Sequence, residues 1–271
     1  MTTIETIADA VARANASNRQ PVMFIHGLWL SPSSWDRWAG MFETAGYAAL
    51  APSWPAEAGG AMAPETIGEV VAHFADIAGR LGRRPAVIGH AFGGLIAQVL
   101  AGRGCSAATV AIDPAPFRGV LPLPVSALRS AWPVLRNPAN AGRQVALTAQ
   151  EFRYAFANAV SATESEDLYD AYQAPAPGKP IFQAAAANLN PWTEARVDVE
   201  AAERGPLLII SGEHDHTVPP PVVRAAYTRQ RRNMEAITEF KALPDRGHSL
   251  TIDAGWREVA DIALAFVERF A

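Results

Sequence analysis

Short runs of apolar residues alternate along this chain with longer segments in which apolar residues recur every three or four positions. The short runs predict buried strands, and the periodic segments predict amphipathic helices. Such alternation is typical of strand–helix–strand units, which build a mostly parallel sheet flanked by helices. We therefore predict an α/β fold with strands over residues 21–25, 47–51, 85–89, 109–112, 206–210 and 236–240.

Apolar residues mark one face of each predicted helix. The face is complete from Ile67 to Leu81, after which Gly82 ends the pattern. Residues 95–100 repeat this spacing, and the chain closes on a further apolar face over residues 256–270. The first helices are predicted over residues 4–12 and 35–45.

The alternation breaks between residue 113 and about residue 200. We expect helical pieces there, around residues 126–136, 147–160 and 164–172, with a Pro-rich loop over 174–180. An insertion of this size between two strands of one sheet has to lie outside the sheet. We therefore predict a core of residues 1–113 and 200–271, with residues 114–199 forming a helical cap.

Composition excludes several classes of function. The chain of 271 residues has a formal net charge of −4, which gives no sign of a nucleic-acid partner. No run reaches about 18 apolar residues, so we expect no membrane span and no membrane partner. Cys105 is the single cysteine, which rules out an internal disulfide and a Cys-based zinc site. A reducing cytoplasm is the expected location.

The strand predicted over 85–89 runs into the sequence Gly89-His90-Ala91-Phe92-Gly93, which opens the next helix. A strand–turn–helix with flanking glycines forces its middle residue into a sharp, strained turn. Such a turn lifts the middle side chain clear of the sheet, at the positive end of the helix dipole. A serine usually stands there, but in this chain it is Ala91, which has no group that can attack a substrate.

Three further sequence positions of interest directly follow predicted strands. The sequence His26-Gly27-Leu28 follows the first strand, where a backbone N–H could form half of an oxyanion hole. Asp215 follows the strand over 206–210 and presents an acid, and His248 follows the last strand and presents a base. The chain order of nucleophile position, acid and histidine is the order expected for this architecture.

With the Gly-x-Ala-x-Gly turn and these three positions, the chain resembles the α/β-hydrolase superfamily, in the branch of serine esterases, C–C hydrolases and cofactor-free haloperoxidase-like enzymes. The resemblance covers about residues 20–113 and 200–271. It implies an α/β-hydrolase fold with the nucleophile at position 91, the acid at Asp215 and the general base at His248. The backbone N–H groups of Leu28 and Phe92 would be the oxyanion donors. No cofactor is implied.

Two departures from the family pattern concern the N-terminus and the nucleophile. The antiparallel hairpin common at the start of the family's sheet is not apparent, because residues 4–12 have a helical pattern. The nucleophile itself is absent.

Other ionisable residues leave alternatives open. Glu213 or His216 could orient the histidine in place of Asp215. His214 and His216 flank Asp215, but a metal site needs a further ligand at suitable spacing, so we predict no metal. Asp113 ends a strand and is expected to cap the turn into Pro114.

The substrate is expected to be a small hydrophobic ester or lactone, because the segment after Gly27 is apolar and includes Trp29. His90 adjoins the elbow, where we expect it to pack under the turn, and it is a second candidate for substrate contact. Residues 115–160 contain five arginines and one acid. Arg118 and Arg153 are therefore candidates to hold a free carboxylate on the substrate, although a solvated surface explains the same charges.

Three accounts explain Ala91. A serine was replaced by mutation, the lineage lost the nucleophile and the chain is now a binding protein, or His248 and Asp215 act without a serine as a general base, as in a cofactor-free oxygenase or lyase. We favour the first account because the acid, the base, the oxyanion loop and both glycines remain. On that account the chain is an inactive esterase that still binds its substrate.

Overall fold

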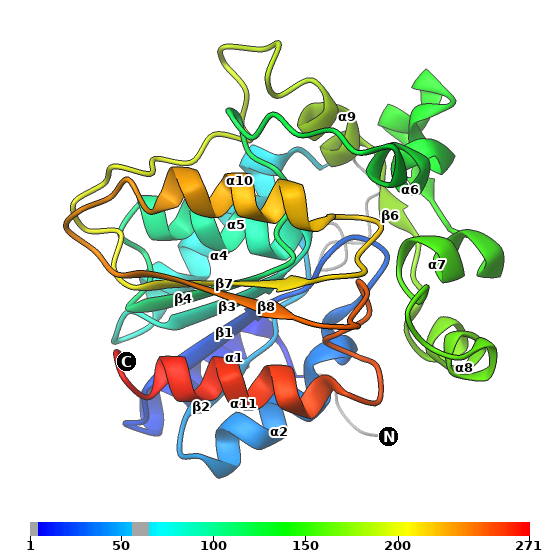
Figure 1. Cartoon of the computed structure of the whole chain (residues 1–271). Helices are drawn as coiled ribbons and strands as arrows, with labels where there is room; N and C mark the ends of the chain where they lie inside the picture. The colour runs from blue at the N-terminus through cyan, green and yellow to red at the C-terminus, as the bar shows by residue number, and fades with distance from the viewer. Residues whose placement is uncertain (1–4, 56–64) are drawn as a thin grey trace.

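The computed structural model describes residues 5–55 and 65–271 and shows a six-stranded parallel sheet (Figure 1). The strand order is β2-β1-β3-β4-β7-β8, and every neighbouring pair is parallel. This confirms the predicted α/β-hydrolase class of fold. The strands are β1 (Pro21–Ile25), β2 (Ala48–Leu50), β3 (Ala86–His90), β4 (Ala108–Ile112), β7 (Leu207–Gly212) and β8 (Thr238–Leu243).

The order of the strands fixes where a ligand can bind. From β1 the chain moves outward to β2 and then returns across β1 to β3, so the winding direction reverses between β1 and β3. In open parallel sheets the crevice beyond the carboxyl ends of the strands, at such a reversal, is the usual binding site. The loop after β1 and the elbow after β3 both lie at this point.

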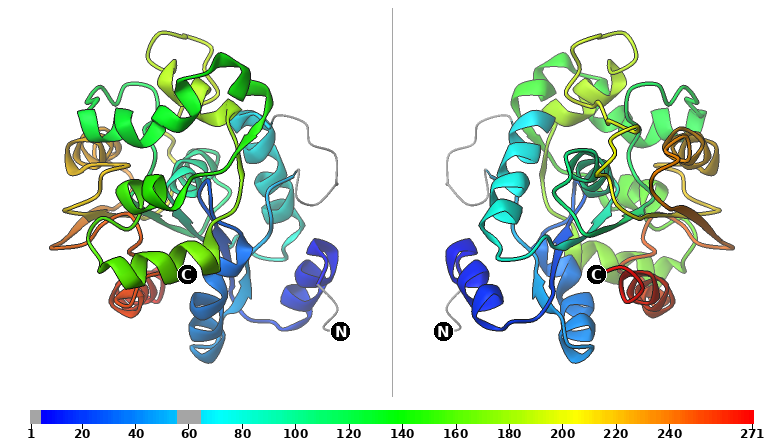
Figure 2. Two further views of the ribbon diagram at one scale, coloured as in Figure 1. Left: turned by 90° about the vertical axis from the view of Figure 1, so that its right-hand side faces the viewer. Right: turned by 90° about the vertical axis from the view of Figure 1, so that its left-hand side faces the viewer.

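Helices cover both faces of the sheet (Figures 1 and 2). On one face, α4 (Ile67–Arg80), α5 (Phe92–Gly102) and α10 (Pro220–Gln230) contribute to the larger apolar core. On the other face, α2 (Asp36–Thr44) and α11 (Trp256–Val267) form a second core with three aromatic side chains of residues 35–42. The sheet is therefore buried on both sides, which explains why its central strands are continuous apolar runs.

Helix α4 illustrates how closely local sequence specifies these elements. Thr66 and Glu69 form a capping box at its start, in which each side chain accepts a hydrogen bond from the other residue's backbone N–H. The apolar positions predicted from the spacing are the buried ones: Ile67, Val70, Val71, Phe74, Ile77 and Ala78.

Residues 114–199, called the inserted segment below, lie beside the sheet rather than in it, on the right of Figure 1. Its helices are α6 (Val125–Leu135), α7 (Ala149–Ala155), α8 (Ala162–Tyr172) and α9 (Lys179–Ala185). A two-stranded antiparallel ribbon of β5 (Gln144–Val145) and β6 (Ala176–Pro177) joins them.

Three local predictions were wrong or shifted. Helix α9 occupies part of the segment expected to be a loop, because Pro180 lies in the helix's first turn, where a missing N–H costs nothing. Strand β8 begins two residues later than predicted; it is an edge strand that leaves Lys241 exposed, so it lacks a continuous apolar run. Helix α7 is shorter than the predicted stretch of 147–160.

The N-terminal helix is α1 (Ile7–Ala16), which packs against β2 and α4. Ile4, included in the predicted helix over 4–12, lies outside the described residues. In the part of the chain that the structure describes, no helix is long and apolar enough to span a bilayer.

Candidate active site

The turn between β3 and α5 holds Ala91 in a backbone conformation that few residues adopt. Its φ is +52°, in the left-handed region that is unfavourable for any residue with a Cβ. A Cβ on Gly93 would overlap the carbonyl oxygen of Ile25, and a Cβ on Gly89 would overlap the backbone of Gly93. The two glycines therefore allow the tight approach of strand and helix that the sequence predicted.

Backbone hydrogen bonds hold Ala91 in place. Its N–H donates to Ile112 O at 3.0 Å, and its carbonyl oxygen accepts from Leu95 N at 3.1 Å and from Ala115 N at 2.9 Å. A strained residue of this kind costs about 1–3 kcal/mol and persists where the surroundings over-determine it. The methyl group of Ala91 has no use for this conformation, whereas the turn would direct a nucleophilic side chain at this position away from the sheet and toward a substrate.

Asp215 and His248 form a buried pair. The Nδ1–H of His248 donates to Asp215 Oδ2 at 2.6 Å, and both side chains are inaccessible to solvent. The second oxygen, Oδ1, accepts from the backbone N–H groups of Thr217 at 2.6 Å and Val218 at 2.8 Å. These bonds fix the carboxylate, which in turn fixes the imidazole tautomer with Nε2 free to accept a proton.

No described residue forms a hydrogen bond with Nε2 of His248. The imidazole is held between two rings, those of Phe156 at 4.8 Å and His90 at 4.5 Å between ring centroids. Because His248 also lines the cavity described below, Nε2 is available to a group bound there.

Asp113 extends this pair, which the sequence analysis did not foresee. Its Oδ1 accepts from Gly212 N at 2.9 Å, and its carboxyl group faces that of Asp215. Complete burial and the nearby charge of Asp215 raise the pKa of Asp113 well above its usual value. Because this side chain accepts its hydrogen bond from Gly212 N at the end of β7, the prediction that it caps the turn into Pro114 is wrong.

The loop after β1 approaches the elbow closely. A Cβ on Gly27 would lie 2.9 Å from Ala91 Cβ, so only glycine fits there without displacing the elbow. Leu28 and Trp29 follow and are buried, and Trp29 has a φ of +63°. The Trp29 indole N–H donates to Val145 O at 3.0 Å, which ties this loop to the inserted segment.

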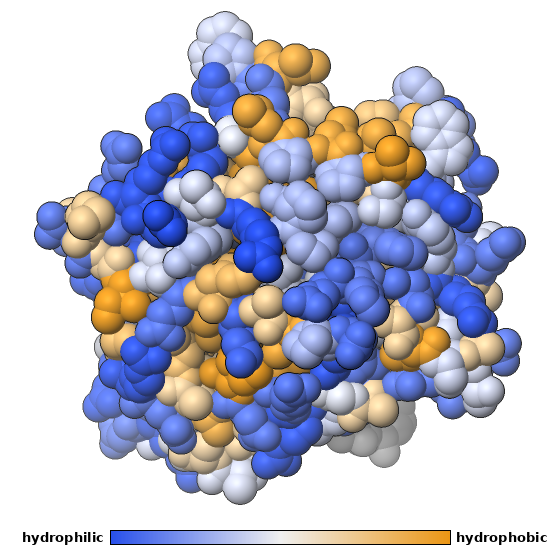
Figure 3. Space-filling model, in the orientation of Figure 1, coloured by the Kyte–Doolittle hydropathy of each residue, from blue (hydrophilic) through white to orange (hydrophobic). Residues whose placement is uncertain are grey.

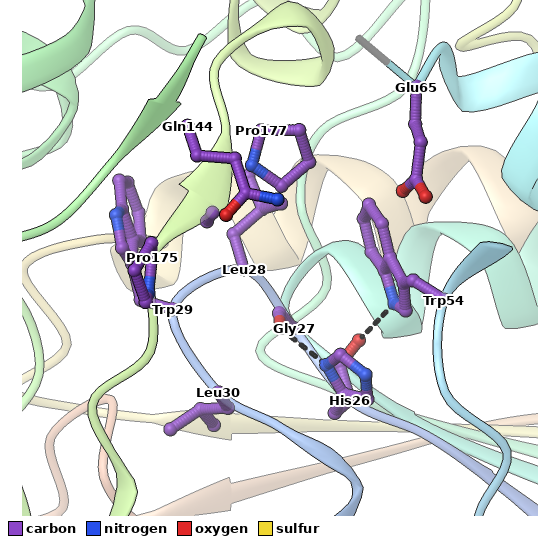
Figure 4. A pocket seen from close by; sticks show the side chains of 11 residues that line it. His26, Gly27, Leu28, Trp29, Leu30, Trp54, Glu65, Gln144, Pro175 and Pro177 are labelled. Carbon is purple, nitrogen blue, oxygen red and sulfur yellow. Dashed lines mark hydrogen bonds between the residues drawn. The ribbon is translucent and has the colours of Figure 1, made fainter. Parts of the chain in front are cut away.

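His26 and Trp54 support the loop from behind (Figure 4). The His26 ring stacks on Trp54 with centroids 5.9 Å apart, and Trp54 Nε1 donates to His26 O at 3.2 Å. The His26 Nδ1–H donates to Gly27 O at 2.9 Å. Burial lowers the pKa of His26 to about 4, so the ring is neutral near pH 7. These contacts fix the position of the loop at Gly27.

A cavity of about 410 Å³ brings the predicted catalytic positions together. Leu28 and Trp29 come from the loop after β1, Ala91 and Phe92 from the elbow, and His248 from the loop after β8. Phe92 is the first residue of α5, so its N–H has no acceptor within the helix. One space therefore touches the elbow, the base and both predicted oxyanion donors.

The walls of this cavity are apolar. The inserted segment supplies most of them, and His248 is the only titratable side chain among the lining residues. The segment's lining side chains include Phe117, Val120, Leu121, Leu123, Leu128, Leu135, Phe156, Ile181 and Leu189. The polar side chains are those of Ser130, Asn188, Thr217 and His248.

Not every candidate binding residue reaches the cavity. Trp29 lines it, whereas His90 is buried beneath His248 and does not. Arg118 donates to Pro191 O at 3.0 Å, and Arg153 is exposed on α7; neither is among the lining residues. Neither arginine therefore places its positive charge in the wall of this cavity.

The described residues contain one group with metal-ligand geometry, Asp113, Asp215 and His248, whose candidate ligand atoms lie within 4.8 Å of one another. Two of these atoms are already joined by the 2.6 Å hydrogen bond. The two histidines considered as metal ligands from the sequence are not in this group. His214 is half-exposed, and His216 Nδ1–H donates to Tyr154 O at 3.0 Å.

Sequence reasoning missed the places of Asp113 and Phe156 in the site. Asp113 was recognised as an acid that ends a strand, but its place beside Asp215 was missed; asking which acids end neighbouring central strands could have found it. Phe156 reaches His248 from the inserted segment, and nothing in its local sequence signals that contact.

A model described as the alpha/beta hydrolase family matches residues 22–262. Among solved structures, an extracellular alpha/beta-hydrolase from a Paenibacillus species, described as sharing homology with tobacco salicylic acid binding protein 2, is similar with a TM-score of 0.69. It is 16% identical, and the match covers 91% of this chain and 98% of that chain.

Two other solved structures give a similar result. A monoacylglycerol lipase from Paleococcus ferrophilus has a TM-score of 0.64 at 19% identity, with coverage of 91% and 93%. A thermophilic esterase from Thermogutta terrifontis has a TM-score of 0.65 at 17% identity, with coverage of 92% and 90%. No curated protein matches the chain.

Proposed function

Because this chain belongs to the alpha/beta hydrolase family, we propose that its site is built to hydrolyse carboxylic esters or lactones and lacks only the nucleophile. One observation carries this proposal. His248, oriented by Asp215 at 2.6 Å, has an unpartnered Nε2 and lines the same cavity as the strained elbow residue Ala91.

With a serine at position 91, the chemistry follows from these positions. His248 Nε2 takes the hydroxyl proton as the oxygen attacks the substrate's carbonyl carbon. The N–H groups of Leu28 and Phe92 stabilise the tetrahedral oxyanion. The alcohol leaves with the proton from His248, and water, activated by the same imidazole, releases the acid. The charge of Asp215 stabilises the imidazolium that forms between these steps.

The cavity favours a neutral, hydrophobic substrate. The described residues that line it include no Lys, Arg, Asp or Glu, and a substrate carboxylate would lose its hydration there without an ion pair in return. We therefore propose a neutral ester or lactone as substrate and assign no carboxylate-binding role to Arg118 or Arg153. In this proposal the inserted segment is a cap that supplies most of the binding surface.

The strained alanine supports the account in which a serine was replaced. The elbow geometry, the dyad and the oxyanion loop are all present around a residue that cannot use them. A methyl group leaves the cavity walls unchanged, so the chain should still bind substrate. Loss of the nucleophile from such a triad costs on the order of 10⁶ in kcat.

A second candidate is a His–Asp general-base enzyme that needs no serine. It is favoured by the same unpartnered Nε2, which is oriented without any contribution from position 91. Turnover of p-nitrophenyl esters by the Ala91→Ser protein discriminates the two proposals. A gain of activity supports the esterase, whereas a folded variant with no gain over the buffer rate supports the alternative.

A further inference from the structure

Large apolar side chains project into solvent around the mouth of the cavity. Of the nine large hydrophobic side chains that are exposed in the described residues, seven lie in residues 121–132 and 189–192. Leu121, Leu123, Leu128 and Leu189 both line the cavity and are exposed, by 42–88% of their surface. Figure 3 shows the apolar side chains gathered at the upper right, over α6 and α9.

Helix α6 turns an apolar stripe outward. Val125, Leu128 and Trp132 follow the spacing i, i+3, i+7 and are 80%, 42% and 60% exposed. Its buried positions are Ser130, Pro133 and Val134, so most of its large apolar surface faces solvent rather than the core. A globular helix normally has the opposite arrangement.

Hydrogen bonds hold the two sides of the mouth together. Gly119 N donates to Asn188 Oδ1 at 2.7 Å, and Asn188 Nδ2 donates to Val120 O at 2.8 Å. Leu121 and Leu189 directly follow residues joined by these hydrogen bonds, so the two leucines lie near each other at the mouth. We call Leu121, Leu123, Val125, Leu128, Trp132 and Leu189 the apolar rim.

The sequence segments that carry the apolar rim are rich in cationic residues, although Glu151, Asp170 and Glu194 lie just beyond their ends. Residues 115–150 and 171–193, which carry the rim, contain four arginines and one lysine but no aspartate or glutamate. Arg129 on α6 and Arg136, which directly follows the helix, are exposed, and Arg129 lies over the Tyr154 ring at 3.9 Å. Projecting apolar side chains beside exposed arginines are complementary to a surface of anionic lipid.

We infer that the apolar rim docks this protein on an anionic lipid surface, with the mouth of the cavity facing the lipid. A protein partner seated on the rim would close the cavity, whereas a lipid surface brings acyl chains to an apolar space that can take them. That the bound lipid is a substrate rests on the proposed function; docking itself does not. The expectation of no membrane partner came from the lack of a spanning segment, which does not bear on surface docking.

Co-sedimentation with unilamellar vesicles tests this inference, and the alanine protein suits it because no turnover is expected to alter the lipid. Vesicles of phosphatidylcholine with phosphatidylglycerol should bind the protein more tightly than phosphatidylcholine alone. The triple variant Val125→Ser, Leu128→Ser, Trp132→Ser should lower the partition coefficient by at least about tenfold. Arg129→Gln with Arg136→Gln should remove the preference for the anionic vesicles.

Met234→Ser with Ile237→Ser is the matched control, because in the described part of the chain these are the two exposed large hydrophobic residues outside residues 121–132 and 189–192. This variant should bind like the unmodified protein, and circular dichroism with the unfolding midpoint verifies that each variant is folded. The inference is overturned if the unmodified protein does not bind the vesicles, or if the rim and control variants bind equally. A different outcome also overturns it: the unmodified protein is a dimer by sedimentation, the rim variant is a monomer, and neither protein binds the vesicles. Because no ester is hydrolysed, failure here leaves the proposed esterase chemistry standing.

Discussion

His248 Nδ1 donates a 2.6 Å hydrogen bond to Asp215 Oδ2, and neither side chain is accessible to solvent. The bond leaves Nε2 directed away from the carboxylate, with no partner among the described residues. An oriented base without a proton donor is the state expected of a catalytic triad whose hydroxyl has been removed. The following predictions concern the protein with serine restored, or the scaffold that holds this site.

In the Ala91→Ser background, Asp215→Asn should lower kcat roughly 10⁴-fold, since an amide places the wrong tautomer of His248 toward the substrate. Glu213→Gln is the matched control, because Glu213 is exposed two residues away. Initial rates on one soluble ester measure both. If Glu213→Gln proves the more damaging change, the acid has been assigned wrongly.

Asp113 should make the protein less stable as the pH rises. The pKa of this buried acid is raised well above its usual 3.8, so the folded state holds its proton where the unfolded state has lost it. The unfolded state then binds fewer protons, and the free energy of unfolding falls as the pH rises above about 4 until the raised pKa is passed.

Asp113→Asn removes this titration while keeping an acceptor for Gly212 N and a donor toward Asp215. The unfolding midpoint of the variant, relative to the unmodified protein, should therefore increase as the pH rises above about 4. Asp113→Ala, which cannot make either bond, should be destabilised at every pH. A constant difference between the asparagine variant and the unmodified protein would show that Asp113 titrates normally.

Gly93→Ala should destabilise the fold by about 2–4 kcal/mol, because its Cβ would overlap Ile25 O and force the strand and the elbow apart. Gly79→Ala in α4 is the control, since a Cβ there meets nothing within 4 Å. That change should stabilise by about 0.5–1 kcal/mol, as alanine does inside a helix. Chemical denaturation of both variants measures the contrast, and equal effects would contradict the elbow geometry.

Features that depend on hydrophobic periodicity and on turn-forming residues could be predicted from the sequence. The strand–turn–helix at Ala91 and the capped helix from Ile67 to Arg80 were recognisable because local sequence and burial agree there. The family resemblance placed Asp215 and His248, and the structure brings them into contact. Their catalytic roles stay predictions.

The remaining features depend on contacts between distant segments. Asp113 was taken for a turn residue because nothing local reveals that it meets Asp215, about a hundred residues later. Arg118 was a candidate for substrate binding on charge alone, but its guanidinium is directed to Pro191 O. The apolar rim escaped notice because helical spacing in α6 does not say which face is buried.

The most direct test of this account is the initial rate of p-nitrophenyl butyrate hydrolysis by the Ala91→Ser protein, measured beside the alanine protein and the Ala91→Ser, His248→Ala double variant. The account predicts saturable turnover by the first protein alone, several orders of magnitude above the other two. Circular dichroism and the unfolding midpoint establish that all three are folded. A folded Ala91→Ser protein that hydrolyses the ester no faster than the alanine protein would contradict the claim that this site lacks only its nucleophile.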